Sequence, residues 1–184
     1  MPCTDEQLML RLKDGDRQSF NALVERYRDR VVSYAYRIVG NSELAQDMAQ
    51  ETFVRIYRSS HTFREGSRFT PWLYKIATNV CLSEKSRRSR EMVCVGSDGL
   101  EAAACPSGAG VEDKVMEAFV SRELCSSISQ LTPEHQSVLV MHIYQGLTYG
   151  EIGEALDIPC GTVKSRLFYA IRKLREVCDL EDQT

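Results

Sequence analysis

Aromatic, amide and cationic side chains share one face of a predicted helix in the middle of the chain. Apolar residues recur along this helix at intervals of three and four, from Leu73 to Val80, and so must face the core. The same spacing places Trp72, Lys75 and Asn79 together on another face. Aromatic rings stack on unpaired bases, amides read base edges and cations neutralise phosphates. This face is therefore typical of contact with single-stranded nucleic acid.

The segments on either side of that helix extend the same chemistry. Upstream, residues 63–69 read FREGSRF and mix aromatic, cationic and small side chains, while residues 85–90 downstream carry four cations. The alternative is that Trp72 is a partly buried packing residue and that the arginines only aid solubility. For Trp72 alone the two interpretations are equally good. The loop, the helix face and the basic tail taken together favour nucleic-acid contact.

A second polar and cationic face lies near the C-terminus. A capping box at Thr148 and Glu151 opens a short amphipathic helix, and residues 157–161 form a tight break before a longer helix capped by Thr162. A short helix, a sharp turn and a second helix with a cationic face are typical of a helix-turn-helix, whose second helix enters the major groove. The alternative is an αα-hairpin with a basic surface. The outward residues of the longer helix are Thr162, Ser165, Arg166, Tyr169, Arg172 and Lys173.

The sequence offers no set of residues typical of an active site. It has no nucleophile–base pair at a plausible site, no phosphate-binding glycine loop and no cluster of metal ligands. His142 falls on an apolar helical face with no second ligand three or four residues away, which favours a core histidine. We therefore expect a protein that is not an enzyme and that holds no metal or cofactor.

Seven cysteines are many for a chain of this length. Their number is odd, they are scattered, and no two form a Cys-x-x-Cys pair. A structural zinc site would need tight pairs, and a disulfide framework would need a secreted context. The favoured interpretation is free thiols in a reducing compartment, and the alternative is a thiol-based redox sensor.

The elements that must position these faces are helices. Thr4 and Gln7 form a capping box that opens the first helix, and an apolar stripe from Phe20 to Ile38 gives the second. A third helix begins near residues 41–42. No stretch alternates with a period of two, so the sequence predicts an all-α fold.

Charge divides the chain into two modules and a linker. The net charge is +5 over residues 1–90, −5 over residues 91–123 and −3 over the remainder, and the whole chain of 184 residues carries −3. This asymmetry predicts two small helical domains, 1–90 and 113–184, joined by a flexible acidic linker at 91–112. No apolar run approaches the length of a membrane span and the N-terminus has no signal-peptide core, so we expect a cytoplasmic protein without membrane insertion.

Four motifs, in order along nearly the whole chain, resemble those of a known family. They read DGDRQSFNALVERY, LAQDMAQETFVRIYR, FTPWLYKIATNVCLSEKSRR and LTPEHQSVLVMHIYQGLTYGEIGEALDIPCGTVKSRLFYAIRKLR. In combination they resemble the two-domain bacterial sigma factors of the extracytoplasmic-function group, group IV of the sigma-70 family.

The resemblance implies a transcription initiation factor that binds core RNA polymerase. The first domain would bind the polymerase clamp and melt the −10 element, and the second would bind the flap of the second-largest subunit and read the −35 element as duplex. The linker would thread toward the RNA exit channel, and an anti-sigma factor would be the inhibitor. The segment 44–57 would face the clamp of the largest subunit, and the implied polymerase contacts are Leu44, Asp47, Gln50 and Glu51.

The resemblance also assigns the two DNA-reading surfaces. Residues 59–79 match the part that captures a flipped base, with Phe63 and Asn79 as walls of the pocket. The −10 contacts are Arg55, Ser59, Phe63, Arg64, Ser67, Arg68, Phe69, Trp72, Lys75 and Asn79. The −35 contacts are Thr162, Lys164, Ser165, Arg166, Tyr169, Arg172 and Lys173.

Two departures from the family pattern stand out. The position of Tyr169 is commonly a cation, which leaves the −35 preference open, and Cys94 and Cys105 in the linker have no role in the pattern. Two rival functions remain at this point. A stand-alone helix-turn-helix regulator would explain only the second domain, and a thiol-based redox regulator would depend on the cysteines.

Overall fold

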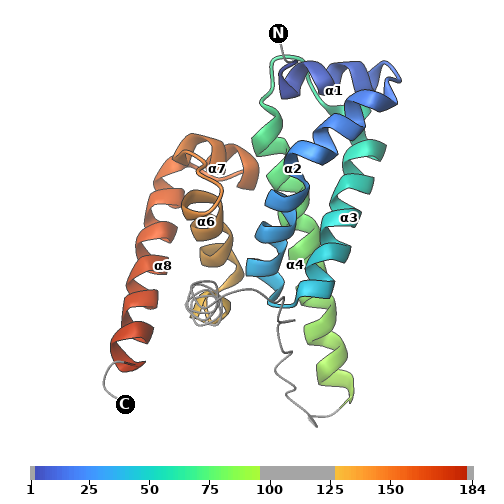
Figure 1. Ribbon diagram of the computed structural model, residues 1–184. Coiled ribbons are helices and arrows are strands. Elements are labelled where there is room, and N and C mark those ends of the chain that lie inside the picture. Colours follow the sequence, from blue (N-terminus) through green and yellow to red (C-terminus); the bar gives the residue numbers. More distant parts are fainter. Residues whose placement is uncertain (1–2, 96–126, 182–184) are drawn as a thin grey trace, which may run out of the picture.

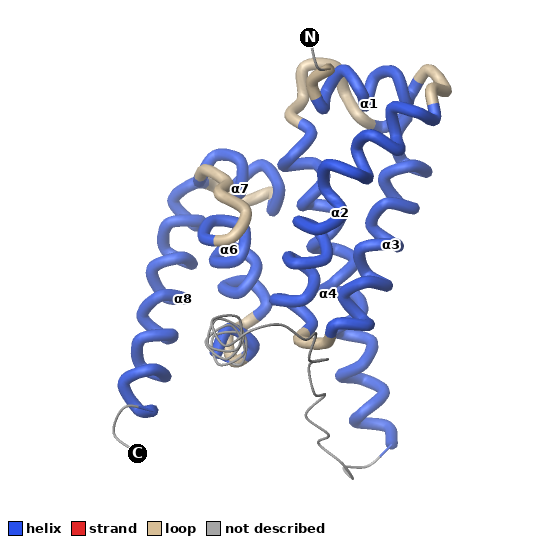
Figure 2. Tube along the Cα trace, viewed as in Figure 1, coloured by secondary structure: helices blue, strands red, loops and turns tan. Residues whose placement is uncertain are grey.

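The computed structural model describes residues 3–95 and 127–181, and every regular element in these ranges is helical (Figure 2). The elements are α1 (Asp5–Lys13), α2 (Arg17–Val39), α3 (Ser42–Ser59), the 3-10 turn η1 (Ser60–Thr62), α4 (Phe69–Val95), α6 (Pro133–Ile143), α7 (Tyr149–Leu156) and α8 (Cys160–Glu181). The predicted all-α fold is confirmed. None of the described helices combines the length and the apolar composition that crossing a bilayer would require.

The first four helices begin and end where local chemistry predicts. The Thr4–Gln7 capping box opens α1, and Asn41 caps α3 through a side-chain bond to the Leu44 amide. Gly40 ends α2 in the left-handed region at φ 74°, which a glycine adopts without steric cost.

The helix α4 is longer than the apolar stripe from Leu73 to Val80 that predicted it. It begins at Phe69, so Thr70 and Pro71 lie inside its first turn. It continues to Val95, so the first residues of the predicted linker are helical. The rest of that linker, with Cys105, lies outside the described residues, as does the structure around Cys125.

The C-terminal helices form the predicted helix-turn-helix. The Thr148–Glu151 capping box is present, and Asp157 ends α7 at φ 61°. A Cβ on Gly153 would come within 2.8 Å of the Ile158 carbonyl oxygen, so only glycine lets the turn pack this closely on α7. The helix α8 starts at Cys160, two residues before the predicted cap at Thr162.

The two groups of helices lie side by side. Figure 1 shows α6 and α7 between the outer helix α8 and the pair α2 and α4. The most extensive contact between the two domains is that of α4 with α7, and α6 contacts α2. The helix-turn-helix and the helix face that carries Trp72 therefore belong to two domains that are in contact with each other.

Candidate functional site

A hollow of about 320 Å³ lies between the end of α3 and the middle of α4. The hydroxyl of Ser59 donates to the Arg55 carbonyl at 2.6 Å, and η1 follows directly, so the chain turns tightly beside the hollow. Asn79 is exposed on the α4 side. Cations, a hydroxyl and an amide around a pocket of this size could hold one unstacked base with its phosphates. The lining residues are Arg55, Arg58, Ser59, His61, Ile76 and Asn79.

Three of the predicted −10 residues, Arg55, Ser59 and Asn79, therefore meet in one place. Arg58 and His61 were missed, although their spacing of three and six from Arg55 is a helical signal. The side chain of Arg55 is held by Glu51, with Nε 2.7 Å from Oε1.

The two phenylalanines of the predicted −10 loop are buried. Phe63 is 1% exposed and Phe69 is 0% exposed. Their rings pack on Trp72, with centroids 5.4 and 6.3 Å away. This corrects the expectation that Phe63 forms an accessible wall of a base pocket, because its ring has no face open to solvent. The rings instead support the half-buried Trp72 from behind.

Helix α1 holds this loop in place. Lys13 Nζ donates to the Phe63 carbonyl at 3.4 Å, and the Phe69 amide donates to Glu6 Oε1 at 3.1 Å. Apolar loop residues carry no periodicity, so their burial could not be predicted from spacing. Arg64 stays exposed and Ser67 is half-buried.

The remaining cations of this surface face the C-terminal domain. Arg68 Nη1 lies 3.0 Å from Glu151 Oε1, and Lys75 Nζ lies 3.5 Å from Asp157 Oδ2. The carboxylates belong to α7 and its C-cap. Two predicted −10 contacts are thus paired within the chain.

Two of the four cations in the basic tail after Ser83 are held in ion pairs. Arg87 and Arg88 both bond Glu84, at 2.7 and 2.9 Å, and the hydrogen bonds from Arg87 and then Arg88 lower the pKa of Glu84 to about 2. Lys85 bonds Gln136 at 2.9 Å, and burial lowers the pKa of its ammonium. The tail therefore offers less free positive charge than its sequence predicts.

The predicted polymerase residues lie on α3. Asp47 and Gln50 are exposed, and Glu51 is half-buried one residue further along. Spacings of three and four place the three side chains on one face. Leu44 is 7% exposed, which corrects its prediction as a direct contact, because it packs inward in the first turn of α3.

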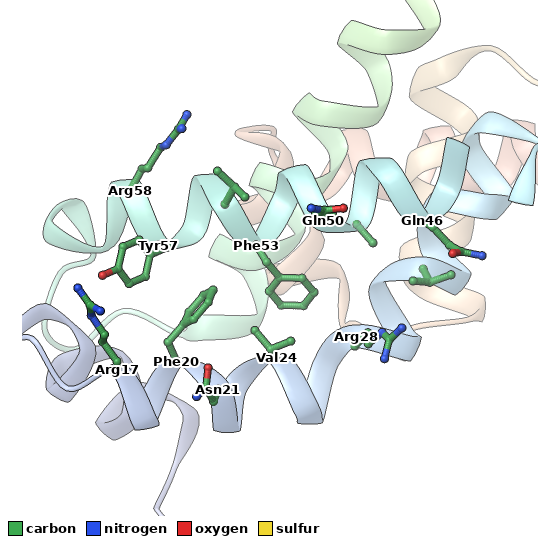
Figure 3. Close-up of a pocket in the computed structure, with 13 residues that line it drawn as sticks. Arg17, Phe20, Asn21, Val24, Arg28, Gln46, Gln50, Phe53, Tyr57 and Arg58 are labelled. Carbon is green, nitrogen blue, oxygen red and sulfur yellow. The ribbon is translucent and has the colours of Figure 1, made fainter. Parts of the chain in front are cut away.

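Gln50 also lines a groove of about 750 Å³ between α2 and α3 (Figure 3). Phe20 and Val24, both half-buried members of the apolar stripe predicted from the sequence, form its wall on α2. Phe20 and Tyr57 approach edge to face at 5.2 Å between centroids. Three cations border the groove, Arg17, Arg28 and Arg58.

The predicted −35 residues lie along α8. Lys164, Ser165, Tyr169, Arg172 and Lys173 are exposed, while Thr162 and Arg166 are half-buried. The Arg172 guanidinium lies 5.0 Å from the centre of the Tyr169 ring, so a cation covers the tyrosine that departs from the family pattern.

Two large apolar residues of the C-terminal domain are exposed. Ile143, the last residue of α6, is 57% exposed, and Phe168 on α8 is 63% exposed. His142 is half-buried and shares a hydrogen bond with the Leu147 carbonyl, with Nδ1 2.9 Å from the oxygen. Among the described cysteines, Cys81 is buried and Cys160 is exposed.

Arg166 is set apart from the rest of α8. It lines a cavity of about 300 Å³ between the domains, together with Lys75, Asn79 and Asp157. Residues predicted for the −10 and the −35 surfaces therefore face one another across this cavity.

Two family models match the chain. The model for sigma-70 region 2 matches residues 23–91, and the model for sigma-70 region 4 matches residues 127–176. The first match covers α2 to α4 except for the start of α2 and the end of α4, and the second covers the helix-turn-helix.

Curated relatives match along nearly the whole chain. The ECF RNA polymerase sigma factor SigW of Bacillus subtilis is 33% identical over 171 residues, covering 90% of this chain and 91% of the relative. The ECF RNA polymerase sigma-E factor of Escherichia coli is 32% identical over 173 residues, covering 91% and 90%.

Two solved structures share the fold. CnrH in complex with the cytosolic domain of CnrY matches with a TM-score of 0.72 at 19% identity, covering 96% of this chain and 97% of CnrH. The sigma factor RpoE of Bartonella quintana, in complex with the anti-sigma factor NepR, matches with a TM-score of 0.70 at 20% identity, covering 88% and 98%.

Proposed function

The chain belongs to the sigma-70 family as one of its ECF RNA polymerase sigma factors, and from that premise we propose which of its surfaces meet polymerase and promoter. As an ECF sigma factor it directs promoter-specific transcription initiation. The observation that carries the proposal is the cationic hollow between α3 and α4, on a different domain from the helix-turn-helix.

The hollow receives one unstacked base of the −10 element. Asn79 reads the edge of this base, while Arg55 and Arg58 neutralise the neighbouring phosphates. Trp72, held by the two buried phenylalanines, offers its exposed part as a stacking surface. Arg64, Ser67, Arg68 and Lys75 bind the strand on either side.

The helix α8 enters the major groove of the −35 element. Its first turns carry Lys164, Ser165 and Arg166 toward base edges. Further along, Tyr169, Arg172 and Lys173 follow the groove and the phosphates. Because Arg172 covers the ring of Tyr169, this part of the helix keeps a cationic surface.

The α3 face formed by Asp47, Gln50 and Glu51 binds the clamp of the largest polymerase subunit. These side chains are available for contact, and Leu44 fixes the start of α3 beneath them. The C-terminal domain binds the flap of the second subunit, for which Ile143 and Phe168 offer exposed apolar surface.

An anti-sigma factor holds the chain inactive until a signal arrives. The match to RpoE, which was solved with the anti-sigma factor NepR, supports such a partner through the shared fold. We place the protein in the cytoplasm, where polymerase is, and we expect no catalytic activity of its own.

Transcription in vitro tests this proposal. The full chain and core RNA polymerase are incubated with fragmented genomic DNA, and the 5′ ends of the transcripts are sequenced. We expect discrete start sites that share two upstream motifs and that require the chain.

Asp47→Lys should abolish these transcripts by placing a cation on the clamp face, whereas Glu25→Lys, at an exposed position on α2, should leave them intact. Sequence-specific binding to duplex DNA without any polymerase-dependent transcript would instead indicate a stand-alone regulator.

A further inference from the structure

Two aromatic side chains lie next to each other on the exposed part of α8. Phe168 is 63% exposed and Tyr169 is 47% exposed, and their ring centroids are 5.7 Å apart in an edge-to-face arrangement. They follow Ser165 at spacings of three and four, so they lie one helical turn beyond a residue proposed for the −35 bases. Figure 1 shows α8 on the outer side of α6 and α7, away from α2 and α4. This apolar surface is therefore available to DNA.

The ring of Tyr169 is held from two sides. Arg172, three residues further along α8, places its guanidinium 5.0 Å from the centre of the ring. His135, near the start of α6, lies with its own ring 6.2 Å away and tilted by 37°. These contacts restrict the orientation of the tyrosine side chain although about half of it is exposed. A side chain that is ordered in advance loses less conformational entropy when it binds.

His135 is itself held by the first residue of its own helix. Its Nδ1 lies 3.1 Å from the hydroxyl oxygen of Thr132, the N-cap of α6, and the two groups share a hydrogen bond. His135 and Tyr169 line opposite sides of a hollow of about 260 Å³ between α6 and α8. The position of the tyrosine ring therefore depends on two helices and not on α8 alone.

The chemistry of Tyr169 differs from that of the cation common at this position in the family pattern. An arginine or lysine on a recognition helix donates to the N7 and O6 atoms of guanine. A tyrosine ring offers apolar surface instead, and in the major groove apolar side chains contact the C5 methyl group of thymine. Arg172 keeps a positive charge beside the ring for the phosphates. This part of α8 is therefore suited to a thymine flanked by backbone phosphates.

We propose that Tyr169 reads the C5 methyl group of a thymine in the −35 duplex, with His135 as a positioning residue that holds its ring. The inference rests on the proposed function, because it assumes that α8 enters the major groove of the −35 element. It adds the identity of one base to that proposal. It also gives the exposed tyrosine a role that the family pattern does not supply.

The helix geometry limits where this thymine lies. One turn of α8 advances about 5.4 Å along its axis, and successive base pairs are about 3.4 Å apart. The thymine therefore falls within about two base pairs of the base that Ser165 meets. The size of the effect is that of one apolar carbon removed from water, which changes an affinity by about 3- to 5-fold.

Replacing thymine by deoxyuridine tests the proposal, because deoxyuridine lacks only the C5 methyl group. Holoenzyme made from the full chain and core polymerase first selects −35 duplexes from a randomised library. Each thymine of the selected motif is then replaced singly by deoxyuridine, on either strand, and the affinity of holoenzyme is measured by competition. We expect one thymine at which wild type binds the deoxyuridine duplex about 3- to 5-fold more weakly.

Variants of the two aromatic residues identify the ring that makes this contact. Tyr169→Ala should bind the thymine and deoxyuridine duplexes equally, whatever its overall affinity. Tyr169→Phe is the matched control and should keep the preference, because it retains the ring and loses only the hydroxyl group. Phe168→Ala should keep the preference as well. Loss of the preference in Phe168→Ala but not in Tyr169→Ala would assign the methyl contact to Phe168 and overturn the proposal.

The ratio of the two affinities also tests the positioning role of His135. His135→Ala should bring the ratio closer to one, and His135→Phe, which keeps a ring against Tyr169, should restore it. A purely structural role would weaken binding to both duplexes equally and leave the ratio unchanged. Far-ultraviolet circular dichroism confirms that each variant stays folded.

The same selection separates this proposal from the proposed function. If holoenzyme selects no −35 motif, the role of α8 in the proposed function fails. If it selects a motif in which no replacement by deoxyuridine weakens binding, the proposal for Tyr169 is overturned and the −35 role of α8 stands. A thymine preference that survives Tyr169→Ala has the same consequence.

Discussion

The side chain of Gln136 donates to the carbonyl oxygen of Arg37 at 2.7 Å, so a residue of the C-terminal domain caps the last turn of α2. The guanidinium of the same Arg37 lies over Tyr144, also of the C-terminal domain. One residue of α2 thus contacts the second domain through both its main chain and its side chain. This contact holds together two helical domains that sequence analysis treats as independent.

Replacing Phe63 should affect folding more than DNA contact. Its ring is buried against Trp72, so Phe63→Ala should lower the free energy of unfolding by about 3–5 kcal/mol. Phe63→Leu, which keeps most of the volume, should cost about 1 kcal/mol. Urea denaturation followed by circular dichroism measures both values. A stable Phe63→Ala protein with a specific loss of promoter melting would instead indicate that the ring contacts the unstacked base directly.

Replacing Asn79 should damage promoter melting at little cost to stability. Asn79 is exposed and lines the hollow, so Asn79→Ala removes an amide from the proposed base contact. Losing an amide contact with a base edge costs about 1–3 kcal/mol, which lowers open-complex formation roughly 5- to 150-fold. Permanganate reactivity of unpaired thymines measures melting. Ser83→Ala, one turn further along α4, is the control and should melt DNA as wild type does.

Local signals were sufficient to predict most of the helices. The capping box of Thr4 with Gln7 and that of Thr148 with Glu151 are both present, because a cap depends only on residues three apart. Periodicity also placed Asn79 on an exposed face. These features depend on neighbours in sequence and are largely independent of tertiary packing.

Features that depend on tertiary packing could not be predicted. Phe63 precedes α4 and Phe69 is its first residue, so no apolar period signals their burial, and α1 holds their main chain through hydrogen bonds that are distant in sequence. Gln136 and Gln145 are polar, so sequence alone gives no sign that they are buried. By contrast, Glu84 lies three and four residues before Arg87 and Arg88, so these ion pairs are a local feature that spacing alone indicates.

The ion pairs of Glu84 should make stability depend on pH. Its pKa falls from an ordinary 4.5 to about 2 in the folded chain, first through the hydrogen bonds from Arg87 and then from Arg88. A lowered folded pKa gives stability that is complete above about pH 4.5 and is lost as the pH falls toward 2. The arginines are half-exposed, so solvent reduces this contribution to about 1 kcal/mol.

Urea unfolding at several pH values measures this contribution. The difference in unfolding free energy between wild type and Glu84→Gln should be largest near neutral pH and should disappear as the pH falls through about 2. Glu25→Gln provides an exposed control without a described ion pair. A difference that stays constant over this pH range would show that Glu84 acts through packing and not through its charge.

Replacing Arg166 should weaken duplex recognition at the −35 element. In the polymerase-bound chain we expect its guanidinium to leave the interdomain cavity and reach a base edge, where a bidentate contact contributes about 1–3 kcal/mol. Arg166→Ala should therefore reduce promoter affinity about 5- to 150-fold. Arg166→Lys keeps the charge but loses the fork geometry, so it should recover only the part of the affinity that comes from charge. Footprinting of holoenzyme on duplex promoter measures both.

A pre-melted −10 bubble should partly rescue Asn79→Ala, since unpairing is already complete, and should leave the Arg166→Ala defect unchanged. Equal rescue of both variants, or of neither, would mean that the two surfaces are assigned to the wrong promoter elements.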